Sequence, residues 1–257
     1  TNICLVHGWG VNRAVWHNIK AYFEGFGQVH LLDLPGYGDR THETFPARIE
    51  DAASLLANDI PDNAIVIGWS LGAILALYIQ INRLVEVKAL QLIAGTPRFT
   101  ASSGWRYGQR LSNFVSFSES FELDYGAALK AFLLLQFSGD ECARQQAKAF
   151  ATAIQDYPDP SKATLQAGLK VLEHSDLRTG LSEVNVPVQI VCGEHDQICA
   201  HGASTFMHQH IAESQLVELD CGHVPFKSCR ADFTAATTQW FSEFDVISTN
   251  GKGAEPV

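Results

Sequence analysis

The chain of 257 residues is 46% hydrophobic and 18% charged, a balance that fits a folded globular protein and excludes a fibrous or intrinsically disordered one. Its net charge of −10 argues against nucleic acid as a partner, because a phosphate backbone is bound by a concentrated positive surface.

Short runs of β-branched and aliphatic residues alternate with helix-length segments along most of the chain. Their apolar character is continuous rather than alternating, which is typical of strands buried on both faces of a parallel sheet. We expect strands at residues 2–6, 29–34, 64–67, 89–94, 188–192 and 215–219. The pattern predicts an α/β fold with a mostly parallel central sheet, helices on both faces, and ligands bound beyond the carboxyl ends of the strands.

Residues 64–81 carry no charge and are long enough to suggest a membrane span. The β-rich start, the break at Gly68 and the helical pattern after Ser70 favour a buried strand, a turn and a buried helix instead. No secretory signal is visible at the start of the sequence. The six cysteines are too dispersed for a zinc pattern and are interpreted as buried thiols, so we expect a cytoplasmic protein.

The alternation of strands and helices stops between residues 97 and 185. Helices are expected there at 126–137, 141–155 and 161–172, with the acidic pair 140–141 at the start of the second. We interpret 97–185 as a helical cap inserted after the strand that ends near Ala94. The core is then formed by 1–96 and 186–247, with a last helix at 231–244 and a flexible tail at 248–257.

The segment 68–72 reads GWSLG and matches the G-x-S-x-G pattern of a strand–turn–helix that presents a nucleophilic serine. The expected strand before it and the helical pattern over 73–81 after it give the short pattern its specificity. Glycine is needed at Gly68 and Gly72 because the backbone doubles back too sharply to leave room for Cβ atoms. We predict Ser70 as the nucleophile; the alternative is a serine that only caps the helix.

A second motif, HGWG at residues 7–10, follows the first strand, where a loop that supplies an oxyanion hole is expected. We assign the two backbone N–H donors to Trp9 and to Leu71, the residue after the serine. Losing one such donor typically slows a reaction by about 10²–10³-fold. His7 is interpreted as a structural residue with a hydrogen-bonded imidazole.

A serine hydroxyl needs a general base, which must be one of ten histidines. His223 follows the last predicted strand, and the glycine before it permits a tight loop. Asp196 follows the preceding strand and can orient the imidazole. The chain order Ser, Asp, His is the one expected for the α/β-hydrolase fold. Glu194 and Asp33 are the alternatives for the acid, although Asp33 is better explained by a turn.

Neither a metal nor another cofactor is expected. The histidines and carboxylates have no compact ligand spacing such as H-E-x-x-H, and the sequence has no glycine-rich phosphate loop or dinucleotide fingerprint. The predicted chemistry therefore uses protein groups alone.

These segments resemble one family, the BioH-like pimeloyl-[acyl-carrier protein] methyl ester carboxylesterases of the α/β-hydrolase superfamily. The similarity covers nearly the whole chain and includes HGWG at 7–10, DLPGYG at 33–38, GWSLG at 68–72, GHVPF at 222–226 and the cap segments 132–136 and 143–145. The tryptophans of the first and third motifs are the most specific feature, since many other hydrolases of this fold lack them. The resemblance implies that Trp9 and Phe132 line an acyl pocket.

The resemblance also implies that basic side chains of the cap dock an acidic carrier protein. Arg144 and Lys148, one helical turn apart, match two of the family's basic positions, and Lys130 lies near a third. From Arg98 to Glu183 the chain has nine basic and ten acidic residues, so the cap is near neutral on a strongly acidic chain. It is the least repulsive surface for an acidic partner. A solvated helix face is the alternative interpretation.

The resemblance thus implies a carboxylesterase that hydrolyses the methyl ester of pimeloyl-[acyl-carrier protein] in biotin biosynthesis, through a Ser-His-Asp triad and an acyl-enzyme. A broad-specificity short-chain carboxylesterase or a C–C bond hydrolase could use the same triad, and a small-molecule receptor with residual hydrolysis is an alternative from another class. A dehalogenase would need aspartate at position 70. We expect a small-molecule or carrier-linked ester substrate, no membrane partner and a monomer.

Overall fold

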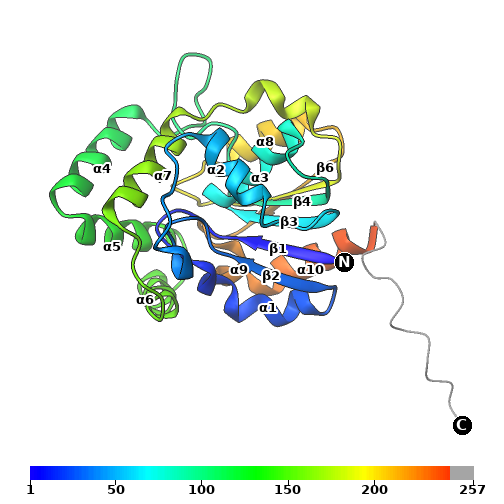
Figure 1. Cartoon of the computed structure of the whole chain (residues 1–257), viewed down its shortest axis with the longest axis horizontal. Helices are drawn as coiled ribbons and strands as arrows, with labels where there is room; N and C mark the ends of the chain where they lie inside the picture. The colour runs from blue at the N-terminus through cyan, green and yellow to red at the C-terminus, as the bar shows by residue number, and fades with distance from the viewer. Residues whose placement is uncertain (244–257) are drawn as a thin grey trace, which may run out of the picture.

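The computed structural model describes residues 1–243, which form a six-stranded sheet with helices on both faces (Figure 1). All neighbouring strands are parallel, in the order β2-β1-β3-β4-β5-β6. The strands are β1 Asn2–Val6, β2 Gln28–Leu32, β3 Ala64–Trp69, β4 Val87–Ile93, β5 Val188–Gly193 and β6 Ser214–Leu219. Every predicted strand is therefore confirmed, with ends that differ by no more than two residues.

Alternate residues of the central strands supply two separate hydrophobic cores. In β3, Ala64 and Val66 belong to one core, while Ile65 and Ile67 belong to the other, as the two-residue period of a strand requires. Strands β3 and β5 are buried throughout. The expectation of burial on both faces is wrong for β2 and β6, which are only partly buried because each lies at an edge of the sheet.

Helices cover both cores (Figure 1). One face carries α1 His17–Glu24, α9 Pro225–Ser228 and α10 Arg230–Glu243, and the other carries α2 Ile49–Ala57, α3 Leu71–Asn82 and α8 His201–His210. Within residues 1–243 there are also three 3₁₀ helices, η1 Arg13–Trp16, η2 Gly38–Arg40 and η3 Arg178–Glu183. The tail expected at 248–257 lies outside the described residues.

Four helices between β4 and β5 gather at the side of the molecule where the strands end (Figure 1). They are α4 Leu111–Leu123, α5 Tyr125–Leu135, α6 Ala143–Ile154 and α7 Lys162–His174, and we call them the cap. Three of them were predicted, whereas α4 was not. Its Phe114, Phe117 and Phe121 follow helical spacing, but the serines between them have weak helix propensity.

The uncharged segment 64–81 folds as β3, a turn at Ser70 and α3 up to Asn82. This is the strand–turn–helix that the sequence predicted. Across residues 1–243, no helix is both long enough and apolar enough to cross a membrane.

Candidate active site

The turn at Ser70 is the sharpest feature of the central sheet. Ser70 has φ 56° and ψ −117°, and non-glycine residues rarely adopt such a positive φ. A Cβ atom at Gly68 would lie 2.5 Å from the carbonyl oxygen of Gly72, and one at Gly72 would lie 2.5 Å from that of Val6. The small residues predicted on either side of the serine are therefore needed for the backbone to close.

Ser70, His223 and Asp196 form a continuous hydrogen-bonded chain. His223 Nε2 lies 2.9 Å from Ser70 Oγ, and His223 Nδ1 lies 2.7 Å from Asp196 Oδ2. The ionised carboxylate can only accept, so Nδ1 carries the proton and Nε2 is free to accept one from the serine. The hydroxyl makes no capping bond to α3, unlike the capping serine of the alternative interpretation.

The backbone fixes Asp196 in the orientation that the imidazole needs. Its second oxygen, Oδ1, accepts the N–H groups of Ile198 at 2.7 Å and Cys199 at 3.0 Å. Asp196 and His223 are 7% and 1% exposed, so water hardly competes for these bonds. Of the two alternatives for the acid, Glu194 is exposed, and Asp33 accepts the backbone N–H groups of Arg13 and Asp39 instead of a proton from His223.

The loop that carries His223 is held from both sides. The backbone carbonyl oxygen of His223 accepts the indole N–H of Trp69 at 2.8 Å, and the backbone N–H of His223 donates to the carbonyl oxygen of Gln136 at 2.8 Å. Asp140 was expected at a helix start, which is wrong, because α6 begins only at Ala143. Its carboxylate instead accepts the N–H of Gly222 at 2.7 Å, so the segment between α5 and α6 holds the loop that carries His223.

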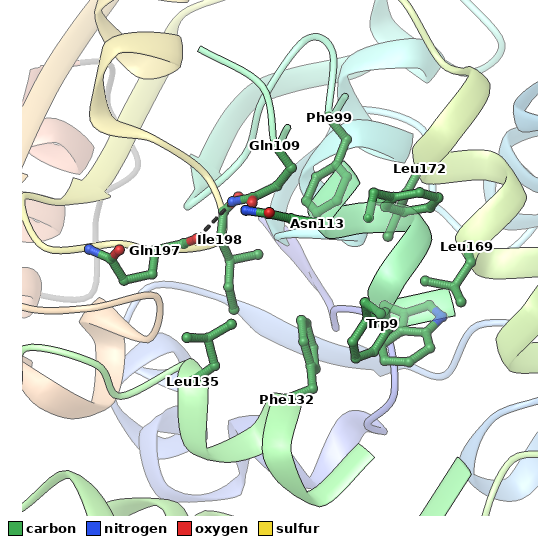
Figure 2. Close-up of a pocket in the computed structure, with 12 residues that line it drawn as sticks. Trp9, Phe99, Gln109, Asn113, Phe132, Leu135, Leu169, Leu172, Gln197 and Ile198 are labelled. Atoms are coloured by element: carbon green, nitrogen blue, oxygen red, sulfur yellow. Dashed lines mark hydrogen bonds between the residues drawn. The ribbon is translucent and has the colours of Figure 1, made fainter. Parts of the chain in front are cut away.

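A cavity of about 300 Å³ lies between the cap and the strand ends (Figure 2). It is lined by Trp9, Phe99, Gln109, Asn113, Phe114, Phe117, Phe132, Leu135, Leu169, Leu172, Gln197 and Ile198. Trp9 meets Phe132 edge to face, with ring centroids 5.1 Å apart. Trp9 and Phe132 thus line the same cavity, whereas the lining residues from α4 were missed together with that helix.

The cavity adjoins the triad through residues that hold it. Ile198 supports Asp196 through its N–H, and Leu135 precedes Gln136, whose carbonyl holds the His223 backbone. The polar side chains gather at one end, where the Gln109 amide donates to the carbonyl oxygens of Gln197 and Ile198 at 2.7 and 2.8 Å (Figure 2). Most of the remaining wall is aromatic or aliphatic, which suits a hydrocarbon chain.

The loop after β1 lies against the serine. A Cβ atom at Gly8 would lie only 3.1 Å from Ser70 Cβ, so Trp9 follows immediately after the closest approach. Within residues 1–243, no hydrogen bond uses the backbone N–H of Trp9 or of Leu71, the first residue of α3. Two unused N–H groups beside the serine, one in a loop and one at a helix start, are the donors that an oxyanion requires.

His7 anchors this loop and takes no part in the triad. Its Nε2 accepts the N–H of Leu34 at 3.0 Å, and its Nδ1 donates to the Gly8 carbonyl oxygen at 2.8 Å. Burial lowers the pKa of His7 despite the nearby Asp33 carboxylate, so the imidazole is neutral. These contacts agree with the structural role expected for His7.

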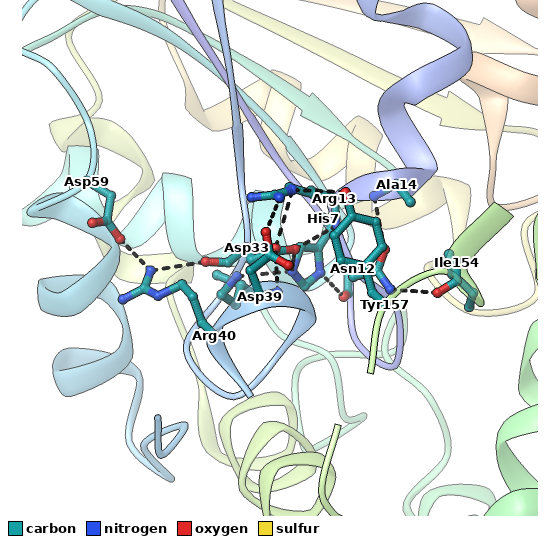
Figure 3. A network of polar contacts seen from close by, with 12 residues as sticks. His7, Asn12, Arg13, Ala14, Asp33, Asp39, Arg40, Asp59, Ile154 and Tyr157 are labelled. Carbon is teal, nitrogen blue, oxygen red and sulfur yellow. Dashed lines mark hydrogen bonds and ion pairs between the residues drawn. The ribbon is translucent and has the colours of Figure 1, made fainter. Parts of the chain in front are cut away.

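A polar network continues from His7 to the cap (Figure 3). Asn12 accepts the N–H of Ala14 through its side-chain oxygen at 3.0 Å and donates to the carbonyl oxygen of Ile154 at 3.0 Å. The guanidinium of Arg13 stacks over the ring of Tyr157. The loop that carries Trp9 is therefore tied to the end of α6.

The three basic residues suggested for carrier docking are all exposed. Neither Lys130 nor the α6 pair Arg144 and Lys148 has an ion-pair partner in the part of the chain that the structure describes. Some other basic groups of the cap region are paired, as with Lys162 and Glu122, whose charged atoms are 2.9 Å apart.

All six cysteines are free thiols. Burial raises the pKa of Cys4 and of Cys192 to about 12, so both remain protonated and are poor nucleophiles. Cys142 is exposed, contrary to the expectation that the thiols are buried. Among residues 1–243, no group of three or more His, Cys, Asp or Glu side chains is arranged to hold a metal ion.

Comparison with known proteins gives one consistent result. The sequence matches the alpha/beta hydrolase family over residues 5–237. A pimeloyl-[acyl-carrier protein] methyl ester esterase of Nitrosomonas europaea is 33% identical over 235 residues, covering 91% of this chain and 93% of that protein. The esterase of the same name from Vibrio cholerae is 32% identical over 226 residues, covering 88% of each chain.

Solved structures with the same fold include an esterase from Exiguobacterium antarcticum. It has a TM-score of 0.83 and 26% identity, covering 94% of this chain and 92% of that one. An enol-lactonase from Burkholderia xenovorans has a TM-score of 0.80 at 18% identity, covering 94% and 91%, and this likeness concerns the fold. The expected fold class is thereby confirmed.

Proposed function

The chain belongs to the alpha/beta hydrolase family, and on that basis we propose that it is a serine carboxylesterase. The observation that carries the proposal is the hydrogen-bonded chain from Ser70 through His223 to Asp196, placed beside a largely apolar cavity. A buried imidazole that accepts from a serine and donates to a carboxylate is the arrangement that makes a hydroxyl nucleophilic.

In the first half-reaction, Ser70 Oγ attacks the ester carbonyl carbon while its proton moves to His223 Nε2. The negative charge that develops on the carbonyl oxygen is bound by the N–H groups of Trp9 and Leu71. His223 then returns the proton to the departing alkoxide, which leaves as the alcohol, and the acyl group stays on Ser70. Asp196 holds the imidazole in one tautomer and stabilises its protonated form.

In the second half-reaction, water attacks the acyl-enzyme. His223 takes one proton from that water, the same N–H groups bind the oxyanion, and the proton is delivered to Ser70 Oγ as the acyl–oxygen bond breaks. The products are a carboxylic acid and the free serine.

The substrate that we propose is the methyl ester of pimeloyl-[acyl-carrier protein], hydrolysed in biotin biosynthesis. The names of the curated relatives support this choice. The apolar cavity beside Trp9 and Phe132 can take up a methylene chain, and each buried methylene contributes about 0.8 kcal/mol. Methyl is a small leaving group, so selectivity comes from the acyl side and the cap.

We propose that the carrier protein docks on the cap beside Lys130, Arg144 and Lys148. These side chains are exposed and without ion-pair partners in residues 1–243, so they are available to an acidic surface. The free thiols support a reducing, cytoplasmic compartment, and we expect the enzyme to act there as a monomer.

A broad-specificity carboxylesterase is the second candidate. The solved esterase from Exiguobacterium antarcticum, which is 26% identical, supports this candidate, because it has the same fold and its name specifies no acyl group. The two candidates share the triad and differ in the acyl groups that they accept.

Two measurements test these proposals. The first compares p-nitrophenyl esters of increasing chain length with dicarboxylate methyl esters, using the intact protein and Ser70→Ala. We expect hydrolysis only with the intact serine. Equal rates in both proteins would rule out an esterase that uses Ser70 as its nucleophile.

The second is complementation of a biotin auxotroph that lacks the methyl esterase. Growth with the intact chain and none with Ser70→Ala supports the physiological substrate. Good ester hydrolysis without complementation would favour the broad-specificity enzyme.

A further inference from the structure

Gln136 is a buried primary amide without a hydrogen-bond partner. Its side chain is 0% exposed, and within the described residues neither Oε1 nor Nε2 makes a hydrogen bond. An unpaired buried polar group destabilises the folded protein, so native proteins rarely leave one without a reason such as a bound water or ligand.

The position of Gln136 links the cavity to the catalytic histidine. Its backbone carbonyl accepts the N–H of His223, which fixes this end of α5 against the histidine loop. Gln136 keeps right-handed helical dihedrals, so its side chain shares one face of the helix with Phe132 and Leu129, four and seven positions earlier.

That face of α5 is turned toward the cavity and the loop after β1. Phe132 points into the cavity and contacts Trp9 (Figure 2). Leu129 lies beside Gly10, where a Cβ atom would be 2.8 Å from its Cδ1. The amide of Gln136 is therefore the polar end of an otherwise apolar stripe, and it is the end nearest His223.

We infer that the Gln136 side chain binds the water molecule that attacks the acyl-enzyme. This inference rests on the proposed esterase function. The attacking water must donate one hydrogen to His223 Nε2, and its second hydrogen needs an acceptor that holds the oxygen toward the acyl carbon. Gln136 Oε1 is an acceptor with no other partner among residues 1–243, and Gln136 directly follows Leu135, which lines the largely apolar cavity.

The chemistry of the amide suits this task. It stays neutral, so it does not compete with Ser70 for the proton on His223, as a carboxylate would. In the step itself the water oxygen bonds to the acyl carbon, one water proton moves to His223 Nε2, and the bond to Ser70 Oγ breaks as Oγ receives that proton. Gln136 gains and loses no proton and acts only on the position of the water.

The test separates the two half-reactions with p-nitrophenyl butyrate. Gln136→Met keeps the volume and removes both polar atoms. Acylation is followed as p-nitrophenolate release in the first turnover, and deacylation as the decay of the acyl-enzyme by intact-protein mass spectrometry. We expect deacylation to slow by about tenfold, the loss of one hydrogen bond in a transition state, while acylation changes less than about twofold.

The melting temperature distinguishes this role from a structural one. Because the amide has no partner in the part of the chain that the structure describes, the apolar variant should melt at the same temperature or higher. A fall of several degrees in both Gln136→Met and Gln136→Leu, or failure of both to fold, would overturn the inference. So would equal slowing of both half-reactions, or no slowing of either.

Gln145→Met is the matched control, because it makes the same change at an exposed glutamine on α6. It should leave both half-reactions unchanged. Failure of the proposed esterase function would look different: the wild-type protein would then form no acyl-enzyme at all, or Ser70→Ala would release p-nitrophenolate as fast as the wild type.

Discussion

The triad and the outer surface of the cap differ in how many of their polar groups are already bound. Both carboxylate oxygens of Asp196, both ring nitrogens of His223 and both backbone polar groups of that histidine have partners. On the cap, by contrast, Leu123 is 90% exposed, and the α6 pair Arg144 and Lys148 has no ion-pair partner among residues 1–243. The triad is built to hold one geometry, whereas the cap surface is open to a second molecule.

This difference predicts two kinds of mutational effect. Changes in the triad should lower the rate for every ester, because all substrates use the same proton transfers. Changes in the cap should discriminate between substrates, because only some have a long acyl chain or a carrier. The largest losses are therefore expected in the triad, and the smallest where the cap joins the core.

The strongest test of the triad is Asp196→Asn. An asparagine amide can donate to His223 Nδ1, which would place the ring proton on Nε2 and leave no acceptor for the Ser70 proton. We expect kcat to fall by about 10⁴-fold for short and long esters alike, the loss typical of this change in a Ser-His-Asp triad. Glu194→Gln, an equivalent change at the exposed rival, should have little effect. Similar losses in both variants would contradict the assignment of the acid.

The geometry of the triad could be predicted because it depends on local features. The carboxyl ends of parallel strands meet at one edge of the sheet, so motifs that follow β3, β5 and β6 must converge there. Gly68 and Gly72 indicate the turn from their spacing around the serine, and their crowded Cβ positions give the physical reason.

The cap was predicted less completely because its form depends on distant contacts. Helix α4 has few strong helix formers, and Phe114 and Phe121 are buried only by packing on other parts of the molecule. Asp140 illustrates the same limit, since its partner Gly222 lies 82 positions away in sequence. Gln136 follows three leucines in the sequence, and nothing in that pattern indicates that its side-chain amide is buried without a hydrogen-bond partner among the described residues.

Phe132→Ala should separate the acyl cavity from the triad. The change removes an aromatic wall that contacts Trp9, so binding of long acyl chains loses apolar contact area. We expect KM for a pimelate methyl ester to rise by about tenfold, with little change in kcat for an acetate ester. These constants can be measured by following acid release at constant pH. If both esters lost activity equally, the residue would be supporting the active site rather than selecting the acyl chain.

Reversing the charge of two basic residues on α6 should lower the hydrolysis of the carrier-linked ester alone. In the double variant Arg144→Glu and Lys148→Glu, we expect kcat/KM to fall several-fold for the carrier-linked ester and to stay constant for a free methyl ester. The difference should shrink as salt is added, because exposed charges are screened within about 8–10 Å at physiological ionic strength. Lys170→Glu, on the exposed side of α7, is the control. Equal activity of wild type and double variant on the carrier-linked ester would place docking elsewhere.

The smallest predicted effect concerns the point where the cap joins the core. Asp176, just after α7, pairs with Arg178 and with Arg98, which lies before α4, so one carboxylate links the entry and exit of the cap. Hydrogen bonds from Arg178, and secondarily from Arg98, lower the pKa of Asp176 from 3.8 to about 2. A lowered folded-state pKa stabilises the protein above the unfolded value and loses that contribution as pH falls from about 4 toward 2.

Asp176→Asn should therefore lower the free energy of unfolding by about 1 kcal/mol at pH 7, since the partly exposed pair is screened by water, and lower Tm by about 2–4 °C. The difference should shrink as pH falls from about 4 and should vanish only near pH 2, because protonation then removes the same charge in the wild type. Thermal unfolding followed by circular dichroism at several pH values measures this difference. A constant difference in Tm at every pH would mean that the carboxylate acts through its hydrogen-bond geometry and not through its charge, and activity on short esters should be unchanged in either case.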